Sequence, residues 1–240
     1  MTNPTVDASM NKMARKAGWL YLLLALCFLF STMYVDSRLY VTGDAAATVS
    51  NIHASEGLFR LGIVSILVGQ IAFMLLVNEL YTLLKSVDRG QARLMLILVV
   101  AGVAAGCLNM ATKCAPLLLS NGAGYLAAFD PAQLDGLAML SLDLYRYGVY
   151  VVDIFWSLWL IPLGLLVYKS GFFPRVMGVL LLIGSIGYLL VSFKLLLPNN
   201  EAISTGSSVF VMISTMAEFI FVFWLLLKGV NIRRAEQGPA

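Results

Sequence analysis

Histidine, cysteine and charged residues are scarce in this sequence of 240 residues. The single histidine, His53, excludes a bis-histidine haem site and argues against a zinc hydrolase, which needs several histidines with carboxylate support. The three cysteines fall inside apolar runs without the spacing of metal ligands, so they predict buried free thiols rather than disulfides. We therefore expect no metal and no cofactor.

Charge is low for a soluble protein. Charged residues make up 12% of the chain and hydrophobic residues 60%, and the mean hydropathy is +0.87. Soluble domains carry about 25% charged residues. No polar stretch is long enough to bury a core of its own. The composition therefore predicts an integral membrane protein that lies in the lipid bilayer. We expect no nucleic acid partner.

Six apolar runs are long enough to cross a bilayer, which requires about 20 mostly apolar residues in a helix. Backbone facing lipid must satisfy its own hydrogen bonds, so we expect an all-α bundle of six transmembrane helices. The transmembrane domain is predicted at residues 15–231, with a cytoplasmic N-terminal segment at 1–14 and a cytoplasmic tail at 232–240. The six spans are predicted at residues 17–34, 58–84, 94–119, 144–168, 176–197 and 209–230.

Lysine and arginine indicate the orientation of these spans. Eleven of the 16 basic residues fall before the first span, after the sixth, or in the two connections on the same side of the membrane. They are Lys12, Arg15, Lys16, Lys85, Arg89, Arg93, Lys169, Arg175, Lys228, Arg233 and Arg234. By the positive-inside rule this side is cytoplasmic. The sequence thus predicts a protein of the cell membrane with both termini inside.

The outer connections differ in their turn and capping signals. "GDAAATVSNIHASEG" predicts a short interfacial helix capped by Asp44. "DPAQLDGLAML" predicts a second one starting at Asp130, with Pro131 in its first turn, and both helices should run into the following spans. "PNNEAISTGSS" predicts a turn-rich loop. Pro162, inside the fourth span, predicts a kink.

Polar residues in the outer half fall on helix faces rather than at random. At about 100° per residue they form a stripe about 100° wide on the second span, and narrower sectors on the third and fourth spans. Gly102 and Gly106 share the sector on the third span and predict close helix packing. We expect the stripes to meet in an outward-facing cavity. Its candidate lining residues are His53, Glu56, Arg60, Gln70, Asn109, Lys113, Asp143, Arg146, Tyr150, Asp153 and Lys194.

Several interpretations of this cluster stay open. Pairs such as Glu56–Arg60 and Asp143–Arg146 suit a purely structural role, in which ion pairs hold the helices in register. Bases in the outer half also suit the binding or transport of an anionic small molecule or lipid headgroup. An intramembrane enzyme could use His53 or Glu56 as a general base beside Asp143 or Asp153. A structural or accessory subunit is a further alternative, and the oligomeric state is not indicated.

Three separated phrases carry a family resemblance: "GDAAATVSNIHASEGLFRLGI", "YLAAFDPAQL" and "SGFFPRVMGVLLLIGSIGYL". Together they resemble the bacterial multi-pass proteins of domain of unknown function 4386, over residues 14–231. The resemblance implies a six-helix fold in the bacterial inner membrane and implies no reaction. Relatives often have a histidine where this chain has Tyr145, so an activity that requires that histidine would be absent here.

Overall fold

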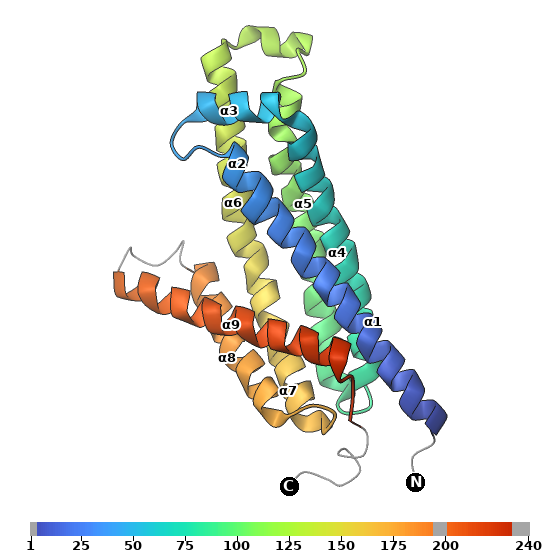
Figure 1. Ribbon diagram of the computed structural model, residues 1–240. Coiled ribbons are helices and arrows are strands. Elements are labelled where there is room, and N and C mark those ends of the chain that lie inside the picture. The colour runs from blue at the N-terminus through green and yellow to red at the C-terminus, as the bar shows by residue number, and fades with distance from the viewer. Residues whose placement is uncertain (1–3, 194–200, 232–240) are drawn as a thin grey trace. The chain divides into compact units, whose positions relative to one another are not determined.

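The structure, a computed structural model, describes residues 4–193 and 201–231, and the side chains of these residues except 4–7 and 201–209. Helices form nearly all of this described chain, and it contains no strand (Figure 1). Six helical segments in it are long and apolar enough to cross a membrane, which confirms the predicted all-α fold with six spans. They are Ala8–Leu39, Glu56–Leu84, Arg89–Leu119, Pro131–Ser170, Arg175–Ser192 and Phe210–Leu227.

The first span is interrupted by a π-helical segment that the sequence pattern did not predict. It comprises α1 (Pro4–Leu29), η1 (Phe30–Asp36) and α2 (Ser37–Leu39). A π segment inserts an extra residue into a turn and so rotates everything that follows relative to a regular α-helix. It therefore decides the direction of Asp36, the last residue of η1.

Capping residues begin the helices of the first two outer connections as predicted. Asp44 accepts a hydrogen bond from the Ala47 backbone amide at 2.9 Å, and α3 (Ala45–Ala54) follows. α4 (Glu56–Leu84), α5 (Arg89–Leu119) and the short η2 (Gly124–Ala128) come next. The side chains of Asp130 and Gln133 accept hydrogen bonds from each other's backbone amides, forming a capping box. α6 (Pro131–Leu158) starts there and continues into the fourth span without a separate interfacial helix.

The prediction of a turn-rich loop in the third outer connection is partly wrong. α9 (Glu201–Leu227) begins inside the phrase that predicted the loop, and residues 194–200 lie outside the described residues. Glu201 and Ala202 favour a helix start, because Ala has high helix propensity and a glutamate complements the positive N-terminal end of the helix dipole. These signals outweighed the glycine and serines that follow.

Pro162 breaks the fourth span as predicted. α6 ends at Leu158 and α7 (Leu160–Ser170) begins after Trp159. Proline has no N–H group to donate to the carbonyl four residues earlier, here that of Leu158. The ladder continues on either side, with Trp159 donating to the Phe155 carbonyl at 3.0 Å and Leu163 to the Trp159 carbonyl at 3.2 Å. The missing bond thus accounts for the break.

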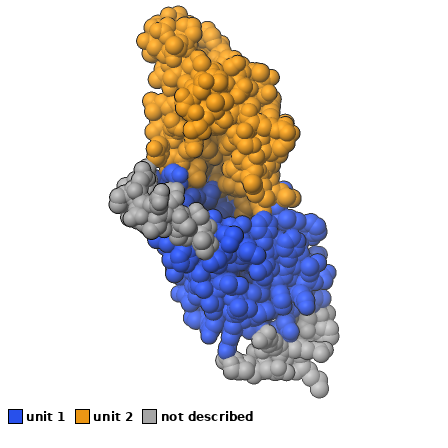
Figure 2. Space-filling model, turned by 60° about the vertical axis from the view of Figure 1, so that its left-hand side comes forward, with its two compact units in different colours: residues 1–23, 72–103, 150–240 blue, residues 24–71, 104–149 orange. Residues whose placement is uncertain are grey.

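The chain divides into two compact units (Figure 2). Unit 1 comprises residues 1–23, 72–103 and 150–240, and unit 2 comprises residues 24–71 and 104–149. Helices α1, α4, α5 and α6 each contribute residues to both units. The core of unit 2 consists of Val35, Leu39, Ile52, Phe59, Ile63, Ile66, Met110, Leu142 and Tyr145.

Small residues let the helices of unit 1 approach closely. A Cβ added at Gly102 would lie 2.9 Å from the Phe155 Cβ, so α5 and α6 pack at this glycine as predicted. A Cβ at Gly164 of α7 would lie 2.9 Å from the carbonyl oxygen of Gly178 in α8 (Arg175–Ser192). Phe73 and Trp159 add an edge-to-face contact with ring centroids 5.0 Å apart.

Hydrogen bonds gather the predicted cytoplasmic segments within unit 1. The Val230 amide donates to Asn11 Oδ1 at 3.0 Å, and the Asn231 amide donates to the Phe172 carbonyl at 3.1 Å. Lys169 Nζ lies 3.2 Å from Asp88 Oδ2. The described segments before the first span and after the sixth thus lie at the same end of unit 1 as the two short connections.

Candidate functional site

Lys113 is the most deeply buried charged residue of unit 2. Its side chain on α5 is 0% exposed, and Nζ lies 2.8 Å from Asp36 Oδ1 and 2.9 Å from Oδ2. An unpaired ammonium at membrane depth is expensive. Asp36 on η1 supplies the neutralising charge, so the pair joins the first span to the third inside unit 2.

Tyr145 and Asn109 complete the surroundings of this pair. The Tyr145 ring centroid lies 4.8 Å from Lys113 Nζ, within the range of a cation–π contact. Asn109 Nδ2 donates to the Tyr145 carbonyl at 2.9 Å. A Cβ at Gly148 would overlap the Asn109 side-chain amide, so the glycine makes room for this bridge between α5 and α6.

Arg146, Asp143 and Tyr40 lie beside the buried pair. Arg146 Nη1 is 3.7 Å from Asp143 Oδ1, and these side chains are 58% and 42% exposed. The Arg146 guanidinium carbon lies 5.8 Å from the Tyr40 ring centroid. The Tyr40 hydroxyl is buried and has no hydrogen-bond partner among the described residues. Burial and the nearby Asp36 carboxylate raise the pKa of Tyr40, so its hydroxyl stays protonated and is a potential donor.

The residues at the start of the second span are more exposed than the cavity prediction implies. Arg60 Nε lies 2.6 Å from Glu56 Oε1, and their side chains are 58% and 49% exposed. His53 is exposed in the last turn of α3, and no carboxylate of the described chain forms an ion pair or hydrogen bond with it. Glu56 and Arg60 thus form one of the predicted structural pairs. This arrangement gives no support to His53 and Glu56 as an acid–base pair.

The remaining candidate residues divide between the units. Gln70 belongs to unit 2, is 2% exposed, and its Oε1 has no hydrogen-bond partner among the described residues. Tyr150 and Asp153 belong to unit 1, where both are half-buried. Lys194 lies outside the described residues. Eight of the eleven candidates therefore belong to unit 2. Six of these form a polar or ring contact with another residue of the unit: Glu56, Arg60, Asn109, Lys113, Asp143 and Arg146.

Three residues of unit 2 contact the candidate residues but were not among them: Asp36, Tyr40 and Tyr145. A buried lysine requires a carboxylate, so Lys113 was itself a signal for a partner such as Asp36. In unit 1 a further polar group surrounds Glu218 of α9, and the sequence did not indicate its partners on other helices. The Tyr21 hydroxyl donates to the Glu218 carboxylate, and the hydroxyls of Tyr188 and Thr215 are 3.4 Å apart.

The described residues contain no group of three or more histidine, cysteine or acidic side chains that could hold a metal ion. Cys27, Cys107 and Cys114 are free, as predicted, but the prediction that they are buried is wrong. Cys107 is exposed beside the 78% exposed Leu108, because an apolar thiol is tolerated on a helix face that meets lipid.

Comparisons with known sequences identify relatives of this chain. The sequence profile described as Domain of unknown function (DUF4386) matches residues 16–229. An uncharacterized protein of Archaeoglobus fulgidus is 36% identical over 86 residues, which are 36% of this chain and 49% of that protein. The chain therefore spans about half the length of this curated relative. No solved structure matches the chain. Six apolar helices and a profile match over most of the sequence show that this multi-pass membrane protein belongs to the DUF4386 family.

Proposed function

We propose that unit 2 binds an anionic group, a carboxylate or phosphate, at Arg146 and Tyr40. One observation carries the proposal: the exposed Arg146 guanidinium lies over Tyr40, and the buried Tyr40 hydroxyl has no hydrogen-bond partner among the described residues. Arginine has five N–H donors in a planar fork that matches carboxylate and phosphate oxygens. Its 3.7 Å contact with Asp143 leaves most of these donors for a ligand.

Lys113 has a supporting role in this proposal. Both oxygens of Asp36 neutralise its ammonium, so Lys113 does not require a second anion. The pair instead holds η1 against α5 and thereby positions the end of the first span, which leads into Tyr40. Arg60 is likewise paired with Glu56 at 2.6 Å and contributes at most long-range attraction.

The orientation predicted from the sequence would put this site on the outer side of the cell membrane. Tyr40 follows the first span, and the lysine and arginine distribution assigns that connection to the outside, with both termini cytoplasmic. The anion would accordingly be an outer-leaflet lipid headgroup or a small solute of the outer compartment. Binding is the part of the function that the contacts support, and transport would be a further property of the same site.

Thermal unfolding of the purified protein in a neutral detergent tests this function. Inorganic phosphate, acetate, phosphatidylglycerol and phosphatidylcholine are added separately to the wild type, Arg146→Gln and Tyr40→Phe. A small-anion site predicts that phosphate or acetate raises the melting temperature, and a headgroup site predicts that phosphatidylglycerol alone raises it. Ligand at 100 times its Kd stabilises the protein by about 2.7 kcal/mol.

Arg60→Gln is the matched control, because it removes the same charge from a similarly exposed arginine that already has a close carboxylate partner. We expect the control to keep the shift and Arg146→Gln and Tyr40→Phe to lose it. If no anion shifts the wild-type melting temperature, or if all three variants retain the shift, the cluster is a set of structural ion pairs.

A further inference from the structure

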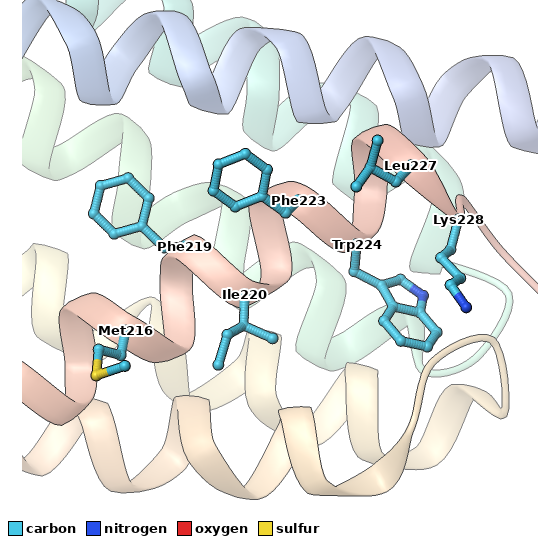
Figure 3. A pocket seen from close by; sticks show the side chains of 7 residues that line it. All are labelled: Met216, Phe219, Ile220, Phe223, Trp224, Leu227 and Lys228. Atoms are coloured by element: carbon cyan, nitrogen blue, oxygen red, sulfur yellow. The ribbon is translucent and has the colours of Figure 1, made fainter.

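A shallow hollow of about 520 Å³ runs along the spanning part of α9 in unit 1 (Figure 3). The side chains along it are bulky and exposed to different degrees, with Met216 59%, Ile220 45%, Phe223 51% and Leu227 74% exposed. Trp224 and Lys228 lie at its end on the same side of the helix. The lining is thus apolar along its length and carries one charge at its end.

The dimensions of this hollow match one leaflet of a bilayer. Leu227 lies eleven positions after Met216, a rise of about 16 Å in an α-helix. Half of a hydrocarbon core about 30 Å thick is about 15 Å. The span ends at Leu227, so Lys228 is the first residue beyond it, where a headgroup phosphate would lie.

The charge at this end favours an anionic partner. Lys228 Nζ lies 5.5 Å from the Trp224 ring centroid, and no carboxylate of the described side chains lies within ion-pair distance of it. In contrast, Lys16 has Glu79 at 2.6 Å and Lys169 has Asp88 at 3.2 Å at the same end of unit 1. The Asn231 hydrogen bond to Phe172 also ties the end of α9 to the connection that carries Lys169 and Arg175.

The shape of this face argues against a second copy of the chain as its occupant. Helices that associate within a membrane favour small residues at the contact, because these let the backbones approach. The residues that line the hollow include no glycine, alanine or serine. Flexible acyl chains adapt to large, uneven side chains such as Phe223 and Met216 more readily than a rigid helix does.

We propose that this face of α9 binds a phospholipid with an anionic headgroup. One acyl chain lies along Met216, Ile220, Phe223 and Leu227, and the phosphate contacts Lys228 beside Trp224. The predicted orientation puts this end in the cytoplasmic leaflet, which carries the anionic lipids. The site involves unit 1 alone and does not depend on the anion site of unit 2.

Native mass spectrometry of the detergent-solubilised protein tests the proposal. The protein is incubated with equal amounts of phosphatidylglycerol and phosphatidylcholine that have the same acyl chains. We expect phosphatidylglycerol adducts to dominate, and Lys228→Gln to reduce them about fivefold, the effect of one basic residue near an anionic surface. Ile220→Ser should weaken adducts of both lipids, because it removes apolar contact for the acyl chain.

Lys85→Gln is the matched control, because Lys85 also lies over an aromatic ring, Tyr81, at 5.8 Å in unit 1 but does not line the hollow. The control should keep the preference for phosphatidylglycerol. Equal adducts of the two lipids, or equal losses in Lys228→Gln and Lys85→Gln, would overturn the proposal. A dimer that Ile220→Ser dissociates would instead identify a second copy as the occupant.

Discussion

Lys113 and Asp36 form a two-oxygen ion pair across 77 residues of sequence, at 2.8 and 2.9 Å, with the lysine side chain fully buried. The two partners are unequal, because 23% of the Asp36 side chain is exposed. Removal of the lysine leaves a carboxylate that still has partial access to its surroundings. Removal of the aspartate charge leaves the fully buried Lys113 ammonium without its countercharge.

This asymmetry predicts the order of two substitutions. Loss of one partner of a buried pair costs about 3–5 kcal/mol. We expect Asp36→Asn to fall in this range and Lys113→Met to cost less, while Glu56→Gln, in an exposed helix pair, costs about 0.3–0.5 kcal/mol. The free energy of unfolding in mixed micelles measures all three. A larger loss for Lys113→Met than for Asp36→Asn would contradict this account.

The close contact between Gly148 and Asn109 predicts that a substitution at Asn109 restores stability lost by a substitution at Gly148. Gly148→Ala would place a methyl group in the Asn109 side-chain amide, at a cost of about 1–3 kcal/mol for overpacking. Asn109→Ala removes that amide and its bond to the Tyr145 carbonyl, a bond worth about 0.6 kcal/mol within a membrane. The double variant should therefore be more stable than Gly148→Ala alone. Additive losses in the double-mutant cycle would show that the two residues do not interact.

The contacts of Asp88 predict that the stability of the protein decreases at low pH. The Gln91 backbone amide and the Lys169 ammonium hold the pKa of Asp88 below its ordinary value. A carboxyl group with a lowered folded-state pKa stabilises the protein above its unfolded-state pKa of about 3.9. This stabilising contribution is lost as the pH falls from the unfolded-state pKa through the lower folded-state pKa of Asp88.

Melting temperatures measured from pH 7 to pH 3 should therefore fall less steeply in Asp88→Asn than in the wild type. The asparagine can still accept the hydrogen bond from Gln91 and does not titrate in this window. Asp130→Asn, at the N-cap of α6, serves as the control because no lysine or arginine of the described residues contacts Asp130. The prediction fails if the profile of Asp88→Asn matches that of the wild type.

The orientation can be tested with single cysteines. After Cys27, Cys107 and Cys114 are replaced by alanine, Thr42→Cys and Ser86→Cys place one exposed thiol in the first outer and the first inner connection. A membrane-impermeant maleimide should label Thr42→Cys in intact cells, and Ser86→Cys only after the membrane is opened. The reverse pattern would place both termini outside.

The sequence predicted the features that depend on neighbouring residues. Apolar runs of sufficient length indicated the six spans, Asp44 and Asp130 indicated two helix starts, and Pro162 indicated the break before α7. Each of these depends on contacts within a few residues, such as a cap that binds an amide three positions on or a proline that lacks a donor. Such local interactions can therefore be predicted from the sequence.

The identity of the polar contacts depended on the arrangement of the helices. A regular helical period put Lys113 on a packed face but could not show that Asp36 faces it, because the unexpected π segment sets the direction of Asp36. The pairing of Tyr21 with Glu218 joins residues 197 positions apart. Hydropathy determines which segments enter the membrane, whereas the meeting of two side chains within it depends on helix rotation, local backbone breaks and the small residues that let helices approach.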